Sequence, residues 1–348
     1  MFLRPPRSFK RLLAELQTKQ QNFPVCMEVI QVFDRPASQV FYSVAGRLLF
    51  IESFDLELRN LIVELFAGWQ LTPVTLPGRS PDIRITFSRG QTLRRIRRNL
   101  DPFEIAEGGK CYTDAGGLYL ELGGAVVHLE NGSSVTVKVS FSELPRLGDP
   151  LLGRAASFAV CAGLRRFGLF DLHSAGVVEP GSGKAVLITG PSGSGKSTLA
   201  MQLVMSGWSY LSDDELLLSV VGDAVEARGF RSFFAVRAAG AGAQFKQCFE
   251  PEVVLGSKRT EQALPRALLF IRLNGESQSQ MKSLTQIETM MRLIRACPWA
   301  TYDKTIAGAN LELLSALAHQ ADGFDLSAGR DLLDPGFATS MLKSVLCG

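Results

Sequence analysis

A chain of 348 residues is long enough for two domains, and its 46% hydrophobic and 20% charged residues allow an ordinary buried core, which argues against disorder over most of its length. A net charge of only +3 gives no electrostatic reason to expect nucleic acid or an anionic membrane as a partner. The six cysteines are dispersed, the basic N-terminus lacks a secretory core, and no apolar run reaches roughly 20 residues, so we expect a cytoplasmic protein.

Short strand-like runs recur through the first part of the chain, from about residue 27 to residue 139. Examples are QVFYSVAGRLLFIES (39–53), DIRITFS (82–88) and VTVKVSF (135–141), with GG and NGS turn signals between such runs. This pattern is typical of antiparallel strands joined by hairpins. DLELRNLIVELFAGW (55–69) instead has apolar residues at helical spacing. We predict a smaller, strand-rich mixed domain over residues 1–150 and consider substrate recognition as its role.

The second part of the chain, residues 151–348, has a different pattern. A helix is predicted over residues 149–169, ending at Gly168 and joining the two halves. A strand (AVLIT, 185–189), a glycine loop, a helix over 197–207 and a strand over 208–212 then follow. A further amphipathic helix is predicted over 283–299, with Ser283 as its cap, Pro298 as its stop and its apolar stripe in the core. The fold class indicated is α/β (α+β).

The glycine loop, GPSGSGKST (190–198), fits the phosphate-binding pattern G-x-x-x-x-G-K-[ST] in the required strand–loop–helix context. Glycines let backbone N–H groups turn toward one point, where the following helix adds the positive end of its dipole. Lysine suits the outer phosphates and the serine hydroxyl suits Mg²⁺. The pattern therefore predicts ATP and Mg²⁺ as cofactors, and the candidate nucleotide ligands are Gly190, Ser192, Gly193, Ser194, Gly195, Lys196, Ser197 and Thr198.

Two acidic residues, Asp213 and Asp214, are expected next to this loop, because the helix that leaves the loop and the strand that returns have nearly equal lengths. The helix rises about 16 Å and the returning strand covers about 17 Å, so the pair lies level with the loop at one sheet edge. One acid can hold Mg²⁺ with Ser197, and the other can accept a proton from an attacking hydroxyl. The alternative for the second acid is a solvated turn residue.

Four segments together resemble a known family. HSAGVV, AVLITGPSGSGKSTLAMQL, GWSYLSDDELLL and VEARGF are similar in order to the catalytic domain of HPr kinase/phosphorylase and its relatives. The resemblance is strong over residues 170–230 and weaker to about 335. It implies a phosphate-loop domain like that of phosphoenolpyruvate carboxykinase over 151–348. The first half does not resemble the N-terminal domain of HPr kinases, which makes HPr itself doubtful as a substrate.

The resemblance also implies roles for individual residues. One aspartate of the pair is the general base for a substrate serine and the other organises the metal; Asp214 is preferred as base, with Asp213 not excluded. His173 would approach the phosphates, Glu226 would be a second metal carboxylate, and Arg228 would support it or touch phosphate. From the residues alone, His173 reads as a structural histidine and EARG as a charged strand edge. The implied catalytic set is His173, Lys196, Asp213 and Asp214, and the implied metal set is Ser197, Asp213 and Glu226.

Two basic regions are weaker candidates. The arginines between residues 89 and 98 could bind an acidic partner, although a solvated surface with extended arginines explains them more simply. The segment from 237 to 258 could form a mobile loop over the substrate. The resemblance to HPr kinases, which use an arginine-bearing loop on phosphate, makes Arg237, Lys258 and Arg259 candidates for that role.

These observations predict an ATP- and Mg²⁺-dependent kinase that phosphorylates a hydroxyl, foremost a serine of a protein or peptide. A metabolite kinase or carboxykinase-like enzyme is the first alternative, and a nucleotide-binding regulatory protein without transfer activity is the second. No nucleic acid or membrane partner is expected. The acceptor, the reverse phosphorolysis reaction, the preferred base and homo-oligomer formation are left open.

Overall fold

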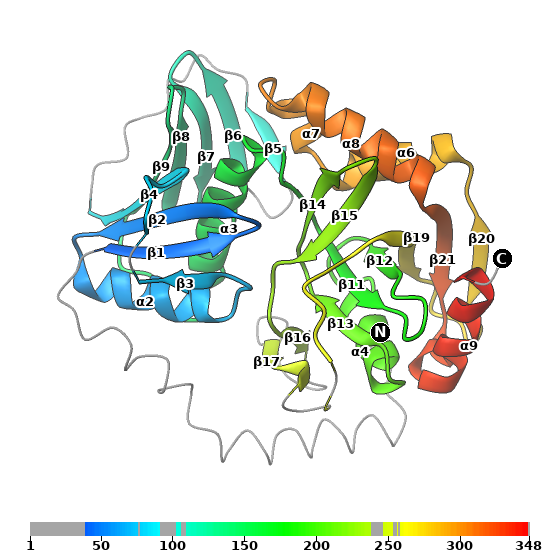
Figure 1. The fold of residues 1–348 in the computed structure, drawn as a ribbon. Helices are drawn as coiled ribbons and strands as arrows, with labels where there is room; N and C mark the ends of the chain where they lie inside the picture. The colour runs from blue at the N-terminus through cyan, green and yellow to red at the C-terminus, as the bar shows by residue number, and fades with distance from the viewer. Residues whose placement is uncertain are drawn as a thin grey trace. The chain divides into compact units, whose positions relative to one another are not determined.

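The computed structural model describes residues 39–75, 77–90, 102–105, 109–237, 246–252, 256 and 258–346. Their contacts divide into two compact units, an N-terminal unit up to residue 170 with residues 298–310, and a C-terminal unit of 171–297 and 311 onward (Figure 1). Each unit is a mixture of strands and helices. None of the helices among these residues is both long and apolar enough to span a membrane.

The division falls after residue 170 rather than at the predicted 150/151 boundary. Helix α3 (Pro150–Arg165), predicted as the joining element, packs on β4, β8 and β9 of the N-terminal unit. Its alanines at 155, 156, 159 and 162 are fully buried, so the small side chains allow a close approach to the sheet. The helix was foreseen from composition, whereas the unit to which it belongs depends on packing.

The described residues of the N-terminal unit form a nine-stranded sheet. Its spatial order is β3 (Thr72–Val74), β1 (Gln39–Val44), β2 (Arg47–Ser53), β4 (Ile83–Arg89), β9 (Val135–Phe141), β8 (Ala125–Glu130), β7 (Gly117–Leu122), β6 (Gly109–Asp114) and β5 (Phe103–Ile105). The predicted hairpins are present, but β2–β4 and β4–β9 pair in parallel. The helix predicted over 55–69 is α2 (Leu56–Ala67). The chain passes through α2 and then β3 between β2 and β4, and this long crossover makes their parallel pairing possible.

The C-terminal unit is built on a six-stranded sheet. Its order is β13 (Ser209–Ser212), β11 (Ser174–Val178), β12 (Ala185–Thr189), β19 (Pro265–Leu273), β21 (Asp322–Ala328) and β20 (Gln280–Ser283). β12, β19 and β21 run parallel, while β11 and β20 are antiparallel to their neighbours. β11 and β12 are buried at every residue, which explains their continuous apolar sequences.

Helices cover both faces of this sheet. On one face α4 (Lys196–Met205) and α9 (Pro335–Leu346) share a core cluster with Leu269 and Ile271 of β19. Phe270 of β19 lies between Leu269 and Ile271 and therefore points to the other face of the sheet. There its ring is covered by Arg292 of α6 (Gln286–Ala296). Of the helices that follow α6 in the chain (Figure 1), α7 (Trp299–Tyr302) belongs to the N-terminal unit, and α8 (Ala307–Gln320) belongs to the C-terminal unit from residue 311 onward.

A smaller sheet and a hairpin complete the described part of the C-terminal unit. The sheet has the order β10 (Phe170–Leu172), β14 (Leu216–Val221), β15 (Ala224–Gly229) and β18 (Gln262–Ala263). The hairpin pairs β16 (Phe234–Arg237) with β17 (Lys246–Phe249). The chain leaves β13 and enters β14 through residues 213–215, so the predicted acid pair lies where the two sheets are joined.

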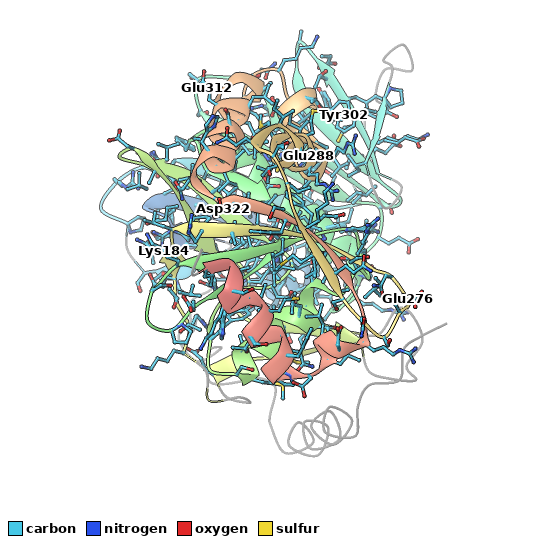
Figure 2. All side chains as sticks on the ribbon, turned by 90° about the vertical axis from the view of Figure 1, so that its right-hand side faces the viewer. Lys184, Glu276, Glu288, Tyr302, Glu312 and Asp322 are labelled. Carbon is cyan, nitrogen blue, oxygen red and sulfur yellow. The ribbon has the colours of Figure 1, made fainter. Side chains whose placement is uncertain are left out.

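The cap predicted for α6 is wrong, because Ser283 is the last residue of β20. The N-cap is Thr285, whose Oγ1 accepts a hydrogen bond from Glu288 N (3.2 Å) while the Glu288 carboxylate accepts one from Thr285 N (2.8 Å). Glu288 is labelled in Figure 2. This reciprocal pair is a capping box.

Thr285→Ala should lower the free energy of unfolding by about 1 kcal/mol, and Ser283→Ala should lower it less in the same urea titration. Equal losses would contradict the assigned cap.

Candidate functional site

One edge of the six-stranded sheet collects segments that are distant in the sequence. Ser174 at the start of β11 pairs with Thr189 at the end of β12, and Gly176 pairs with Ser212 at the end of β13. Because β11 lies antiparallel between two strands that run the other way, its beginning meets their ends. His173, the loop that begins at Gly190, and Asp213 therefore leave the sheet at the same edge.

The glycine loop lies between β12 and the first residue of α4, Lys196. A Cβ on Gly190 would lie 2.5 Å from the Ile271 carbonyl oxygen, so the loop passes too close to β19 for a side chain. Gly195, the N-cap of α4, has a φ of +101°, which glycine adopts without strain. The strand, loop and helix that the motif requires thus occur together.

Lys196 is buried beneath this loop, with 6% of the residue exposed. Its Nζ donates hydrogen bonds to the carbonyl oxygens of Gly190 (2.7 Å) and Pro191 (3.2 Å), so the loop curls around the ammonium group. The Ser194 hydroxyl is also buried and has no hydrogen-bond partner among the described residues. Ser192 and Gly193 are exposed at the tip. A cation and an unsatisfied donor in a loop at a helix N-terminus fit a phosphate group.

Gly190→Ala should weaken ATP binding by roughly 10- to 100-fold, because the added carbon forces the backbone of the loop or of β19 to move. Titration with a fluorescent ATP analogue measures this. Gly308→Ala, on α8, is the matched control, since a Cβ there has no atom within 4 Å. Unchanged affinity in Gly190→Ala would show that the loop does not hold the nucleotide in this conformation.

Asp213 contacts the helix that follows the glycine loop. The Ser197 hydroxyl donates to Asp213 Oδ1 (2.8 Å), and the backbone N–H of Ala235 donates to Asp213 Oδ2 (3.0 Å). Asp213 is 1% exposed, so both oxygens are held in fixed directions. A serine hydroxyl beside a carboxylate offers the oxygen ligands that Mg²⁺ prefers. These residues fit a magnesium ion next to bound phosphates.

Asp214 has a different environment from its neighbour. Its side chain is 45% exposed, and its Oδ1 lies 3.6 Å from Nδ1 of His173, whose side chain is 48% exposed. The backbone of Asp214 has a φ of +67°, an uncommon conformation for a residue with a side chain. The acid pair therefore divides into a buried member against the helix and an accessible member beside a histidine.

Residues 230–235 hold the acid pair in place, and sequence reasoning did not single them out. Ser212 and Tyr210 of β13 both bind this segment, and Arg231 pairs with Glu215 at 2.6 Å. Burial raises the pKa of Tyr210 well above its ordinary value, with the Asp213 carboxylate as a second cause. The Tyr210 hydroxyl therefore keeps its proton and donates to the carbonyls of Phe233 (3.0 Å) and Arg231 (3.1 Å). No local pattern in the sequence marks these contacts.

Glu226 and Arg228, both assigned through the resemblance, lie on β15. Glu226 pairs in register with Ser219 and Arg228 with Leu217, so Arg228 is the nearer of the two to the turn that carries the acids. Glu226 Oε1 lies 3.6 Å from the Arg228 guanidinium, which also contacts Gln262. The structure thus brings His173, Ser197, Asp213 and Asp214 together, whereas it places these two on the hairpin as each other's partners. Their metal and phosphate roles stay predictions.

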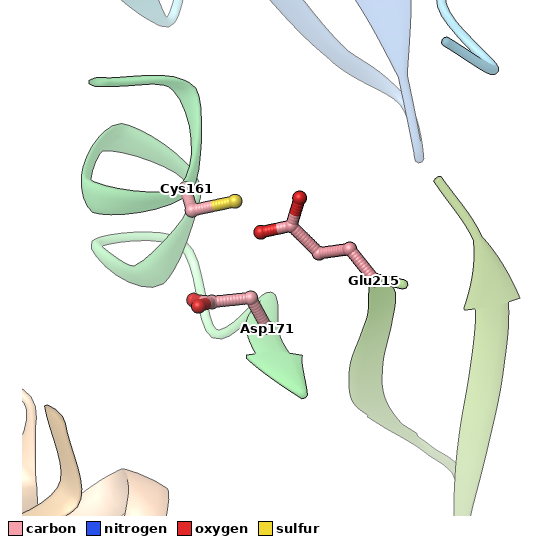
Figure 3. Close-up of side chains that lie close together, drawn as sticks. All are labelled: Cys161, Asp171 and Glu215. Carbon is pink, nitrogen blue, oxygen red and sulfur yellow. The ribbon is translucent and has the colours of Figure 1, made fainter. Parts of the chain in front are cut away.

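Two other carboxylates lie near the acid pair: Glu215 directly follows it in the chain, and Asp171 lies on the strand next to β14. Glu215 stands at the start of β14 and Asp171 on the neighbouring β10, and carboxylate oxygens of the two lie within 4.8 Å of each other (Figure 3). Glu215 is bound by Arg231, which supplies a compensating charge. We therefore regard Glu215 as part of the support of the acid turn.

The remaining basic candidates either form contacts away from the glycine loop or lie outside the described residues. Arg89 pairs with Asp55 at 2.6 Å and with Glu57 at 3.5 Å, at the start of α2. Arg259 pairs with Glu252 at 3.1 Å, and the backbone of Lys258 binds Tyr210 of β13. For Arg237 the structure describes the backbone in β16. The arginines at 94, 95, 97 and 98 and most of the predicted loop over 237–258 fall outside the described residues.

Comparison with known proteins finds similarity among solved structures. No family model and no curated protein matches the chain. The solved Hpr(Ser) kinase/phosphatase from Coxiella burnetii matches with a TM-score of 0.31 and 13% sequence identity, over 51% of this chain and 97% of that one. A TM-score of this size is too low to support an inference about activity. The functional conclusion therefore depends on the geometry of the site.

Proposed function

We propose that this chain is an ATP- and Mg²⁺-dependent kinase that transfers the γ-phosphoryl group to a hydroxyl, foremost a serine of a protein or peptide. The observation that carries the proposal is the contact of the buried Asp213 with Ser197, directly after the lysine around which the glycine loop curls. A second, accessible acid next to Asp213 supplies the group that a kinase needs and a simple nucleotide-binding protein does not.

Each residue has a role that follows from its position. The N-terminus of α4 and Lys196 bind the negatively charged phosphates, and Ser197 with Asp213 would hold the metal. Mg²⁺, when bound, neutralises the charge of the phosphates. Asp214 accepts the proton of the acceptor hydroxyl at its exposed carboxylate, which solvent and a substrate can reach. His173 orients that carboxylate from one side.

The acceptor class is tested by following label from [γ-³²P]ATP. The chain is incubated with Mg²⁺ and either total protein from a cell lysate or a metabolite extract, and the products are separated by size. Label on serine in the protein fraction is the expected result. Label confined to small molecules would identify a metabolite kinase instead. Tight ATP binding without transfer to either fraction or to water would contradict the proposed activity.

A further inference from the structure

We propose that Ser212 is a positioning residue: its hydroxyl holds the turn 212–215 closed, keeps Asp214 in a left-handed backbone conformation and so directs the Asp214 carboxylate toward His173 and the acceptor. The inference rests on the proposed function for its catalytic consequence. Its structural part, the conformation of Asp214, is independent of any activity.

The Ser212 hydroxyl is fully buried and makes three short hydrogen bonds to backbone groups. Its oxygen accepts from the N–H groups of Phe230 (3.1 Å) and Arg231 (2.9 Å), and its proton is donated to the Glu215 carbonyl (2.6 Å). A hydroxyl has one donor and two acceptor positions, so its capacity is filled. The Ser212 side chain thereby links the two ends of the turn 212–215 and also links this turn to residues 230–231, which follow β15.

The bond from Ser212 to Glu215 spans the two acids. A second bond inside the same turn runs from Glu215 N to the Asp213 carbonyl (2.8 Å). Together these two bonds restrict the backbone dihedral angles of Asp214 to the observed conformation, with a φ of +67°. Left-handed backbone is disfavoured by the Cβ of every residue except glycine, so it persists where surrounding bonds enforce it. Without the Ser212 hydroxyl, Asp214 should relax to an ordinary conformation.

Asp213 is fixed by other groups, which makes the effect of Ser212 specific. Both carboxylate oxygens of Asp213 have partners outside the turn, Ser197 on α4 and Ala235 N on β16. Asp214 instead lies inside the turn that the Ser212 hydroxyl closes, with its Oδ1 3.6 Å from Nδ1 of His173. Removal of the Ser212 hydroxyl should therefore displace the base and leave the metal and phosphate ligands in place.

Ser212→Ala should slow release of labelled phosphate from [γ-³²P]ATP and Mg²⁺ in single turnovers, with water as acceptor, by roughly 100-fold. The affinity for the ATP analogue should stay within about twofold. In the Asp214→Asn background the same substitution should cause no further loss, because the group through which Ser212 acts is already gone. The crystal structure of Ser212→Ala should show Asp214 outside the left-handed region.

Ser206→Ala is the matched control. Its hydroxyl also donates to backbone carbonyls, Gln202 (3.0 Å) and Pro335 (3.1 Å), at the far end of α4. It should lower thermal stability without changing the rate. If Ser212→Ala does not fold, Ser212→Cys keeps the volume with a weaker donor and should show the same pattern in smaller size.

Two results would overturn the inference: a φ at Asp214 that stays positive in the Ser212 variant, or an equal loss of rate with and without the Asp214 carboxylate. A failure of the proposed function looks different. The unaltered chain would then release and transfer no phosphate, while the conformation of Asp214 in the variant would still show whether Ser212 holds the turn.

Discussion

Asp214→Asn should bind ATP with an affinity within about twofold of the unaltered chain and transfer phosphate more slowly by roughly 10²- to 10⁴-fold. The amide keeps the shape of the side chain but cannot accept a proton from a hydroxyl. Because Ser197 binds Asp213 and Lys196 binds the loop carbonyls without any contribution from Asp214, the nucleotide site should survive the change. Equilibrium titration with an ATP analogue and single-turnover transfer measure the two effects separately.

Asp223→Asn is the control for this experiment. Asp223 is an exposed aspartate in the turn between β14 and β15, so its replacement changes the net charge equally without touching the site. Asp213→Asn should also lose phosphate transfer, and any remaining transfer rate should no longer depend on the Mg²⁺ concentration. Full activity in both the Asp213 and the Asp214 variants would show that the acid pair does not perform the chemistry.

Lys196→Ala should weaken ATP binding by at least roughly 10- to 100-fold, since a hydrogen bond to a charged group contributes about 1.5–3 kcal/mol. Turnover should fall below detection. Lys196 is buried at the base of the loop and is held by two loop carbonyls, so its ammonium is fixed where phosphates would bind. The substitution also removes the groups that satisfy those carbonyls, which should lower the unfolding temperature slightly.

Lys184→Ala provides the comparison for charge and residue type. Lys184 is exposed in the turn between β11 and β12 (Figure 2). Its removal should change neither binding nor stability measurably. If both lysine variants bound the ATP analogue like the unaltered chain, the glycine loop would not be the nucleotide site.

The glycine loop and the acid pair were predictable because both depend on local rules. The loop follows from residue types at fixed spacing, and the return of Asp213 follows from the lengths of one helix and one strand. The structure shows this return as a 2.8 Å contact between Ser197 and Asp213. The separate environments of the two acids were not predictable, because they depend on Ala235 N of β16 and on His173, which lies between β10 and β11.

Elements that depend on distant contacts were beyond sequence reasoning. The parallel pairs of β4 with β2 and β9 are set by α2 and by the strands inserted between β4 and β9. The assignment of α3 to the N-terminal unit depends on the strands that it covers. At α6 the signal was present but misread, because the T-x-x-E spacing from Thr285 marks the cap better than Ser283 does.

The most direct test of the central claim is a crystal structure with a non-hydrolysable ATP analogue and Mg²⁺. We expect the phosphates within the loop 190–196, the metal within reach of Ser197 and Asp213 directly or through one water, and Asp214 facing the γ-phosphate. Acids that lie farther than one water layer from the metal and the phosphates, with the nucleotide bound, would contradict the kinase proposal and leave a protein that only binds ATP.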